Sequence, residues 1–236
     1  MKLQNSVALV TGANRGLGLA LATALLERGA SKVYAAARTP APSSDARIVP
    51  VALDVTKLDT VATAARQLGD VTLLVNNAGI IRGRGILAGG ALASAREEIE
   101  TNYIGPLAMS EAFAPILAKN GGGAILNILS VLSWVAPAST ATYSASKAAA
   151  WALTNALRAE LGPHGTQVTA LHVGYIDTDM ARGLTAPKVR PEEVARRALD
   201  GVEAGADEIL VDDLSKIVKA GLSQGLYLRP PPAPTE

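Results

Sequence analysis

The sequence predicts an α/β fold, a doubly wound (Rossmann-type) arrangement in which helices cover both faces of a seven-stranded parallel sheet. Three observations support this. The apolar run at residues 7–10 passes through a glycine-rich turn into a helical pattern at residues 17–26. Short apolar runs then alternate with helical patterns along the chain. These runs lack regular polar–apolar alternation, which is typical of strands buried on both faces.

The elements follow one another in a regular order. Strands are expected at residues 7–10, 32–37, 47–53, 71–75, 124–129, 167–172 and 208–211. After the first helix, helical patterns are found at residues 58–68, 97–117 and 143–161, and further helices are expected between the last strands. Ligands of such sheets bind at the carboxyl ends of the strands. Functional residues are therefore expected just after strands.

A chain of 236 residues can form one domain with a substantial core, and no linker divides it. We expect a single domain over residues 1–227. Residues 228–236 are rich in proline, which cannot continue a helix or donate to a strand ladder, so this tail is expected to be unpaired. A proline-rich peptide ligand is the alternative interpretation.

The composition excludes several classes of protein. With 49% hydrophobic residues, 18% charged residues and a net charge of +1, the chain resembles neither a disordered protein nor a basic nucleic-acid binder. The absence of cysteine excludes disulfides and a cysteine nucleophile, and with only two histidines no metal centre is expected. No apolar run approaches the roughly 18 residues that span a membrane. We expect a cytoplasmic protein with a small-molecule ligand.

The turn after the first expected strand has the features of a phosphate site. Gly12, Gly16 and Gly18 lack Cβ atoms, so the backbone can turn tightly and approach a ligand closely. Free N–H groups at the start of the next helix would face an anion. This pattern predicts a bound dinucleotide pyrophosphate, although glycine triplets also occur by chance in loops.

A second group of residues has catalytic potential. Tyr143 and Lys147 are four apart and share one helical face, and Ser130 ends an expected strand that leads to the same cleft. A nearby ammonium would lower the phenol pKa and make Tyr143 a general acid and base. Ser130 would hold a carbonyl oxygen. Taken alone, Tyr143 and Lys147 could instead be a surface pair in which the aliphatic part of the lysine packs against the tyrosine ring.

Together with further motifs, these residues make the chain resemble the short-chain dehydrogenase/reductase family. The motifs that support the resemblance occur in the family's order and span most of the chain: Thr11-Gly12-x-x-x-Gly16-x-Gly18, Asp54-Val55-Thr56, Asn76-Asn77-Ala78-Gly79, Asn102, and Ser130 followed by Tyr143-x-x-x-Lys147. The resemblance implies a doubly wound oxidoreductase that transfers hydride between a nicotinamide cofactor and a carbonyl or alcohol substrate.

The resemblance also implies individual roles. Tyr143 would protonate the carbonyl oxygen as hydride arrives, and Ser130 would hydrogen-bond that oxygen. Lys147 would bind the nicotinamide ribose and lower the Tyr143 pKa, while Asn102 would hold a water that supplies protons to Lys147. Asp54 would contact adenine and Asn76 would stabilise the central strands. Without the other motifs, Asp54, Asn76 and Asn77 could be ordinary turn residues.

The sequence departs from the family pattern at two positions. Val173 precedes Gly174 where the family usually has proline, and Thr178 is retained, so the nicotinamide contacts are expected to survive. Ser133 stands where the family often has glycine, which is expected to place a side chain near the substrate entrance.

The end of the second strand predicts the cofactor. An acidic residue there would repel a 2′-phosphate, but this chain has Ala37 followed by Arg38. Arg38 and Arg15 are expected to bind that phosphate, which favours NADPH, unless both are solvated surface charges. The expected cofactor contacts are Gly12, Asn14, Arg15, Gly16, Leu17, Gly18, Arg38, Asp54, Val55, Asn76, Ala78, Gly79, Tyr143, Lys147, Gly174, Ile176 and Thr178.

The sequence says less about the substrate. Residues 178–191 are expected to form a small mobile cover. An apolar wall is expected from Trp134, Val135, Tyr175 and Met180, although each could equally be core, and it favours an apolar aldehyde or ketone. His164 and His172 are assigned no catalytic role. An NADPH-dependent carbonyl reductase is the expected function, with an NADP-binding scaffold or a non-redox isomerase or dehydratase as alternatives.

A homodimer or homotetramer is also expected. The helix at residues 143–161 is rich in alanine, which would let it pack closely against a second copy, and members of the family usually associate through this helix and the one before it. The alanines could instead pack closely against the sheet of their own chain.

Overall fold

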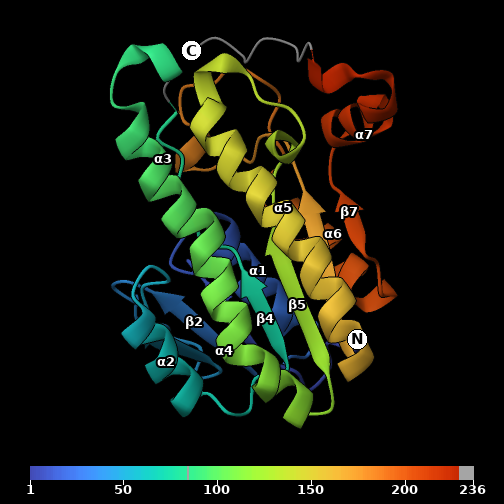
Figure 1. Cartoon of the computed structure of the whole chain (residues 1–236). Helices are drawn as coiled ribbons and strands as arrows, with labels where there is room; N and C mark the ends of the chain where they lie inside the picture. The colour runs from blue at the N-terminus through green and yellow to red at the C-terminus, as the bar shows by residue number, and fades with distance from the viewer. Residues whose placement is uncertain (84, 229–236) are drawn as a thin grey trace.

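Seven parallel strands form one sheet in the computed structural model, which describes residues 1–83 and 85–228 (Figure 1). The strand order is β3-β2-β1-β4-β5-β6-β7, and every neighbouring pair is parallel. The strands are β1 (Val7–Thr11), β2 (Lys32–Ala37), β3 (Ile48–Ala52), β4 (Leu73–Asn76), β5 (Gly123–Ile128), β6 (Thr166–His172) and β7 (Glu208–Leu210). The predicted fold class is confirmed, and the strand order reverses between β1 and β4, where such folds bind ligands.

Helices cover both faces of the sheet. They are α1 (Gly16–Glu27), α2 (Leu58–Gln67), α3 (Ala91–Ile99), α4 (Gly105–Lys119), α5 (Ala141–Leu161), α6 (Pro191–Ala204) and α7 (Asp213–Gly221). In Figure 1, α4 and α5 lie in front of the sheet, with α1 and α6 behind it. Because side chains alternate along a strand, Leu73 and Val75 pack with α1 and α6, whereas Leu74 packs with α4.

The helix expected at residues 97–117 is longer and interrupted. It begins at Ala91, after Gly90 in a left-handed conformation, and ends at Lys119. Between α3 and α4 the chain forms a π-helical turn, Glu100–Ile104. Such turns are often found at functional sites, and this one contains the buried Asn102. The apolar periodicity of the sequence could not show this π-helical turn, because the turn shifts the repeat only locally within a continuous helical segment.

The C-terminal end differs slightly from expectation. Leu228 belongs to a short 3₁₀ turn, Leu226–Leu228, and donates its N–H to the Gly225 carbonyl at 2.9 Å. The rest of the expected proline-rich tail, residues 229–236, lies outside the described residues. Within residues 1–83 and 85–228, no helix is long and apolar enough to cross a membrane, and no group of three or more acidic or histidine side chains is arranged to hold a metal ion.

Candidate active site

The glycine turn connects β1 to α1 at the carboxyl end of the sheet. Gly12 and Gly16 have φ angles of 67° and 55°, a region that favours glycine. A Cβ on Gly18 would overlap the carbonyl oxygen of Gly12, so only glycine permits this close approach. Leu17 packs its side chain into the core and can offer only backbone to a ligand. The turn is therefore shaped as the sequence predicted.

The loop after β4 lies against this turn. The Thr11 hydroxyl donates to the Val75 carbonyl at 3.2 Å and accepts from the N–H groups of Asn77 and Ala78, both at 3.0 Å. The Asn77 amide donates to the Thr11 carbonyl at 2.8 Å. Thr11 and Asn77 thus tie the two ligand-facing loops together. Sequence reasoning quoted both in motifs but assigned neither this role.

Asn76 lies in a buried polar chain between strands and helices. Its amide donates to Asn127 Oδ1 at 2.8 Å, across the β4–β5 pair. The Asn127 amide donates to Thr154 on α5 at 2.9 Å. These bonds are of the kind expected if Asn76 stabilises the central strands. The Asn76 side chain is buried inside the protein.

Ser130, Tyr143 and Lys147 come together from β5 and the first turns of α5, and all three side chains are buried. The Lys147 ammonium donates to the Ile128 carbonyl at 2.9 Å and lies 5.8 Å from the centroid of the Tyr143 ring. A Cβ on Gly79 would lie 3.6 Å from Lys147 Nζ, so the loop after β4 borders the same space.

The electrostatics of this group differ from expectation. Burial raises the pKa of Tyr143 well above its usual value and the charge of Glu98 adds to the rise, while a hydrogen bond with Ser130 opposes it. Burial lowers the pKa of Lys147 to about 8. The pKa of Tyr143 is therefore raised and not lowered as expected, because burial outweighs the hydrogen bond from Ser130 that favours the phenolate.

Asn102 connects the π-helical turn to both neighbouring segments. Its Oδ1 accepts from the Ile80 N–H at 2.9 Å, and its amide donates to the Ile80 carbonyl at 2.9 Å and to Ser146 Oγ at 2.9 Å. One turn earlier, the fully buried Glu98 accepts from the Arg82 N–H at 2.6 Å. Glu98 was missed by sequence reasoning, which had no signal that this charged residue faces inward.

Ser133 folds its side chain back onto its own turn. It is buried, and its hydroxyl accepts from the Ser130 N–H at 3.4 Å. The Ser130 hydroxyl in turn accepts from the Leu132 N–H at 3.1 Å. These reciprocal caps bury the Ser133 hydroxyl, and its expected place near the substrate entrance stays a prediction.

The end of β2 carries Arg38, whose side chain is exposed and has no hydrogen-bond or ion-pair partner in the part of the chain that the structure describes. Asp54 lies near it after β3 and accepts from Thr56 N–H and Oγ at 3.0 and 2.8 Å. Burial opposes ionisation of Asp54, but these bonds and the Arg38 charge hold its pKa below the usual value. Val55 packs against Gly105 at the start of α4.

Arg15 and Asn14 point to other parts of the chain. Arg15 forms an exposed ion pair with Asp179 at 2.7 Å. The Asn14 amide donates to the Thr39 carbonyl at 2.6 Å, and its Oδ1 accepts from the Ala41 N–H at 3.0 Å, so Asn14 holds the loop after β2. Exposed ion pairs contribute little, about 1 kcal/mol or less, so Asp179 does not bar Arg15 from a phosphate.

The segment after β6 returns to the glycine turn. The Gly174 N–H donates to Asp212, the N-cap of α7, at 2.6 Å. The Thr178 N–H donates to the Ile176 carbonyl at 2.8 Å, and its methyl group would lie 3.1 Å from a Cβ on Gly16. Asp212 was missed, although an aspartate after a strand and three before a serine is a helix-capping signal.

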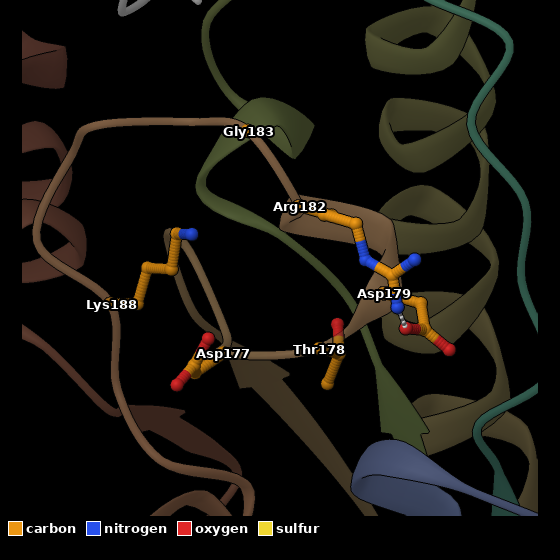
Figure 2. A pocket seen from close by; sticks show the side chains of 6 residues that line it. All are labelled: Asp177, Thr178, Asp179, Arg182, Gly183 and Lys188. Carbon is orange, nitrogen blue, oxygen red and sulfur yellow. Dashed lines mark hydrogen bonds and ion pairs between the residues drawn. The ribbon is translucent and has the colours of Figure 1, made fainter.

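A polar cavity of about 350 Å³ is lined mainly by residues of the expected cover. Figure 2 shows its lining side chains, with Arg182 bonded to Asp179 across the short 3₁₀ turn; the lining comprises Asp177, Thr178, Asp179, Arg182, Gly183 and Lys188. The cover is held at its base, because Val189 bridges to Ile176. This end of the site is more polar than the sequence suggested.

The expected apolar wall is only partly present. Trp134 and Val135 belong to a buried cluster with Val131 of the turn after β5 and Val218 of α7, so core packing accounts for them. Met180 is 52% exposed and remains available to a ligand. Tyr175 is half-buried, which raises its pKa.

Comparisons with known proteins agree with the geometry of the site at this edge of the sheet. A family model described as short chain dehydrogenase matches residues 6–188. The chain belongs to the short-chain dehydrogenase family. The match covers the glycine turn, the loop after β4 and the Ser130–Tyr143–Lys147 group, and it shows an oxidoreductase fold.

Named relatives and solved structures of the family are similar over most of the chain. A 1-deoxy-11-beta-hydroxypentalenate dehydrogenase of Streptomyces exfoliatus is 35% identical over 80% of this chain and 74% of its own. A gluconate 5-dehydrogenase of Gluconobacter oxydans is 31% identical over 88% of this chain and 86% of its own. A short chain dehydrogenase of Burkholderia cenocepacia, solved in complex with NADP, is 45% identical, with a TM-score of 0.93 over 97% of this chain and 98% of its own.

Proposed function

We propose that this short-chain dehydrogenase reduces the carbonyl group of an apolar aldehyde or ketone with NADPH, reversibly. The observation that carries the proposal is the buried Ser130–Tyr143 pair with Lys147 one helical turn away. The nicotinamide would supply the hydride. Because burial raises its pKa, Tyr143 keeps its proton at neutral pH and is suited to donate it to the carbonyl oxygen. Ser130 would donate a hydrogen bond to that oxygen.

Lys147 and Asn102 would support this proton transfer. The Lys147 amine, with a pKa of about 8, exchanges protons readily near neutrality and would contact the nicotinamide ribose. Asn102 holds the Ile80 backbone beside Lys147 and would place a water that returns protons to it. In the direction of oxidation, Tyr143 takes the proton back from the alcohol.

The glycine turn fits a dinucleotide. Without a Cβ on Gly18, the start of α1 can pack directly against the Gly12 backbone. The N-terminus of α1 then lies in the turn, where its free N–H groups would face a pyrophosphate. The preference for NADPH is supported by Arg38, whose guanidinium has no partner among the described residues, and by Ala37, where an acidic residue would repel the phosphate. The Burkholderia cenocepacia structure, in complex with NADP, supports the same choice.

The proposed substrate class rests on fewer observations than the proposed reaction and cofactor. The exposed Met180 and the half-buried Tyr175 support an apolar carbonyl compound, while the cavity lined by the cover residues is polar. A panel of aldehydes, aryl ketones, diketones and steroids, followed by NADPH absorbance, tests the function. Net NADPH consumption with any of them supports a reductase. Cofactor binding without turnover would indicate a scaffold, and turnover without net NADPH consumption an isomerase or dehydratase.

We also propose a homo-oligomer. A groove of about 560 Å³ runs between α4 and α5. Its apolar lining is Leu107, Ala114, Pro115, Ala118, Leu157 and Leu161, and its polar lining is Ser110, Glu111, Glu160, His164 and Thr166. A second copy of this chain is the occupant we infer, because the same alanine-rich helices would meet across a two-fold axis.

A further inference from the structure

His172, which ends β6, lies directly behind the proposed catalytic serine. Its side chain is completely buried, and Nδ1 lies 3.0 Å from the main-chain carbonyl oxygen of Ser130. A carbonyl oxygen only accepts hydrogen bonds, so Nδ1 carries the hydrogen and donates it. The contact joins residues 42 apart in sequence, so it is made only by the fold.

The imidazole ring is held in one orientation. It stacks on Trp134 with centroids 3.8 Å apart and 19° between the planes. Trp134 itself meets Trp151 of α5 edge-on, with centroids 6.3 Å apart. Because Trp134 belongs to the turn that begins at Ser130, the ring touches this turn twice, through stacking and through the Ser130 carbonyl.

The far side of the ring faces a charged pair on β7 and α7. Nε2 of His172 lies 3.5 Å from Glu208 Oε1, and Lys219 bonds both Glu208 oxygens, at 2.9 and 2.8 Å. Lys147 is the further cation that acts on the ring. Burial lowers the pKa of His172 to about 4, so the ring stays neutral in the working range, with Nδ1 as donor.

Ser130 is thus anchored at three atoms. Its N–H donates to Ser133 Oγ and its hydroxyl accepts from the Leu132 N–H, both within its own turn. Its carbonyl accepts from the Ser133 N–H at 3.0 Å and also from His172, whose bond is the one that reaches Ser130 from β6. The N–H groups of Leu129 and Val131 bond to the carbonyls of Leu171 and Val173, so the segment stays on β6 without His172. Loss of the His172 bond would therefore change the orientation of the Ser130 peptide, and with it the direction of the Ser130 hydroxyl relative to Tyr143.

We propose that His172 is a positioning residue, which holds the Ser130 main chain so that its hydroxyl and that of Tyr143 face the same carbonyl oxygen. Stacking on Trp134 holds the ring for this purpose. This inference rests on the proposed carbonyl reduction and assigns His172 no contact with substrate or cofactor.

The test compares His172→Asn with His172→Gln. The Asn amide nitrogen lies as many bonds from Cα as Nδ1 and can donate to the same carbonyl, whereas the Gln amide lies one bond farther out. We expect His172→Asn to keep kcat within about threefold of the wild type, and His172→Gln to lose about tenfold or more, because small misplacements of catalytic groups are costly. The KM for NADPH should be unchanged in both, because neither change touches the cofactor site.

Equal kcat values for the two variants would overturn the inference, since polarity and burial alone would not separate them. The kcat ratio of wild type to His172→Asn should also stay constant from about pH 6 to pH 9, because the imidazole is neutral throughout. A ratio that changes with pH would overturn a pure positioning role. Absence of wild-type turnover on the carbonyl panel would overturn the proposed function together with this inference, an outcome distinct from turnover with equal variants.

Discussion

At the scale of single residues, burial determines the chemistry of the site. Tyr143 and Lys147 are both enclosed, and enclosure favours the neutral form of each, raising the pKa of the phenol and lowering that of the amine. The phenol of Tyr143 therefore keeps its proton at neutral pH and is available as a proton donor. Burial of the lysine ammonium carries a cost in the folded protein.

Tyr143→Phe removes the transferable proton and keeps the ring. We expect carbonyl reduction to fall by about 100-fold or more, with NADPH binding nearly intact. Steady-state kinetics and cofactor fluorescence titration measure the two quantities. Turnover near that of the wild type would mean that another group protonates the substrate.

Lys147→Met should stabilise the cofactor-free protein while it damages turnover and cofactor affinity. The folded-state pKa of about 8 lies below the usual 10.5, so between these values the unfolded chain binds more protons and stability rises with pH. Relief of the buried ammonium, less the lost bond to Ile128, should add about 2 kcal/mol to the free energy of unfolding near pH 7.

The advantage of the methionine variant should shrink as the pH rises through 8 toward 10.5. Denaturant unfolding of both proteins at several pH values measures it. A difference independent of pH would show that Lys147 is not the titrating group.

Arg38→Ala should weaken NADPH selectively. Loss of a charge-assisted bond to the 2′-phosphate costs about 1.5–3 kcal/mol, or roughly tenfold to a hundredfold in affinity, while NADH, which lacks that phosphate, should be unaffected. Values of kcat/KM for both cofactors measure the effect. Arg66→Ala, which changes an exposed arginine of α2, is the matched control and should leave both values unchanged.

Ala37→Asp combined with Arg38→Ala should invert the preference toward NADH, because the carboxylate accepts from the ribose hydroxyls and repels the phosphate. Arg15 remains and should blunt the inversion. An equal loss for both cofactors in Arg38→Ala would return Arg38 to a solvated surface charge.

At the scale of elements, the π-helical turn is the feature that organises the site. It lets Asn102 reach both the Ile80 backbone and Ser146 of α5, so three segments meet at one amide. Regular periodicity would not bring these partners together, because an α-helix repeats every 3.6 residues and the turn inserts a residue into that repeat.

Asn102→Ala should lower the free energy of unfolding by about 2–4 kcal/mol, because it leaves the buried groups of Ile80 without partners. Turnover should fall as well, since the segment beside Lys147 loosens. Urea unfolding and kinetics measure the two effects. Glu100→Ala, an exposed position in the same turn, should change stability by no more than about 0.5 kcal/mol. Equal effects at both positions would argue that helix propensity alone matters.

At the scale of the whole molecule, two layers of helices enclose the sheet and leave the α4–α5 groove facing outward. Small side chains allow helices to approach closely, which favours a second copy of the same surface.

Light scattering at micromolar concentration should give the mass of a dimer or tetramer. Ala118→Arg places an exposed, bulky charge in the groove and should shift the mass to that of a monomer. Ala62→Arg, on the exposed face of α2, is the matched control and should not. A monomeric wild type would rule out the oligomer.

Much of this architecture could be predicted from local signals. The boundaries of β2 were predicted to the residue, and the other strands within about two residues, because buried strands are short apolar runs between turns. All four residues expected to be catalytic are buried, and their catalytic roles stay a prediction. The length of the helix around Asn102 and the outward position of Met180 needed the structure.

What the sequence determined by itself was the order of strands and helices, the glycine turn and the identity of the candidate catalytic side chains, because these depend on local periodicity, backbone freedom and functional groups. The tertiary structure decided the rest. The pKa values of Tyr143 and Lys147 depend on how completely other segments enclose them, and the contact of His172 with Ser130 joins neighbouring strands. Burial and long-range contact are properties of packing, which no local pattern of residues records.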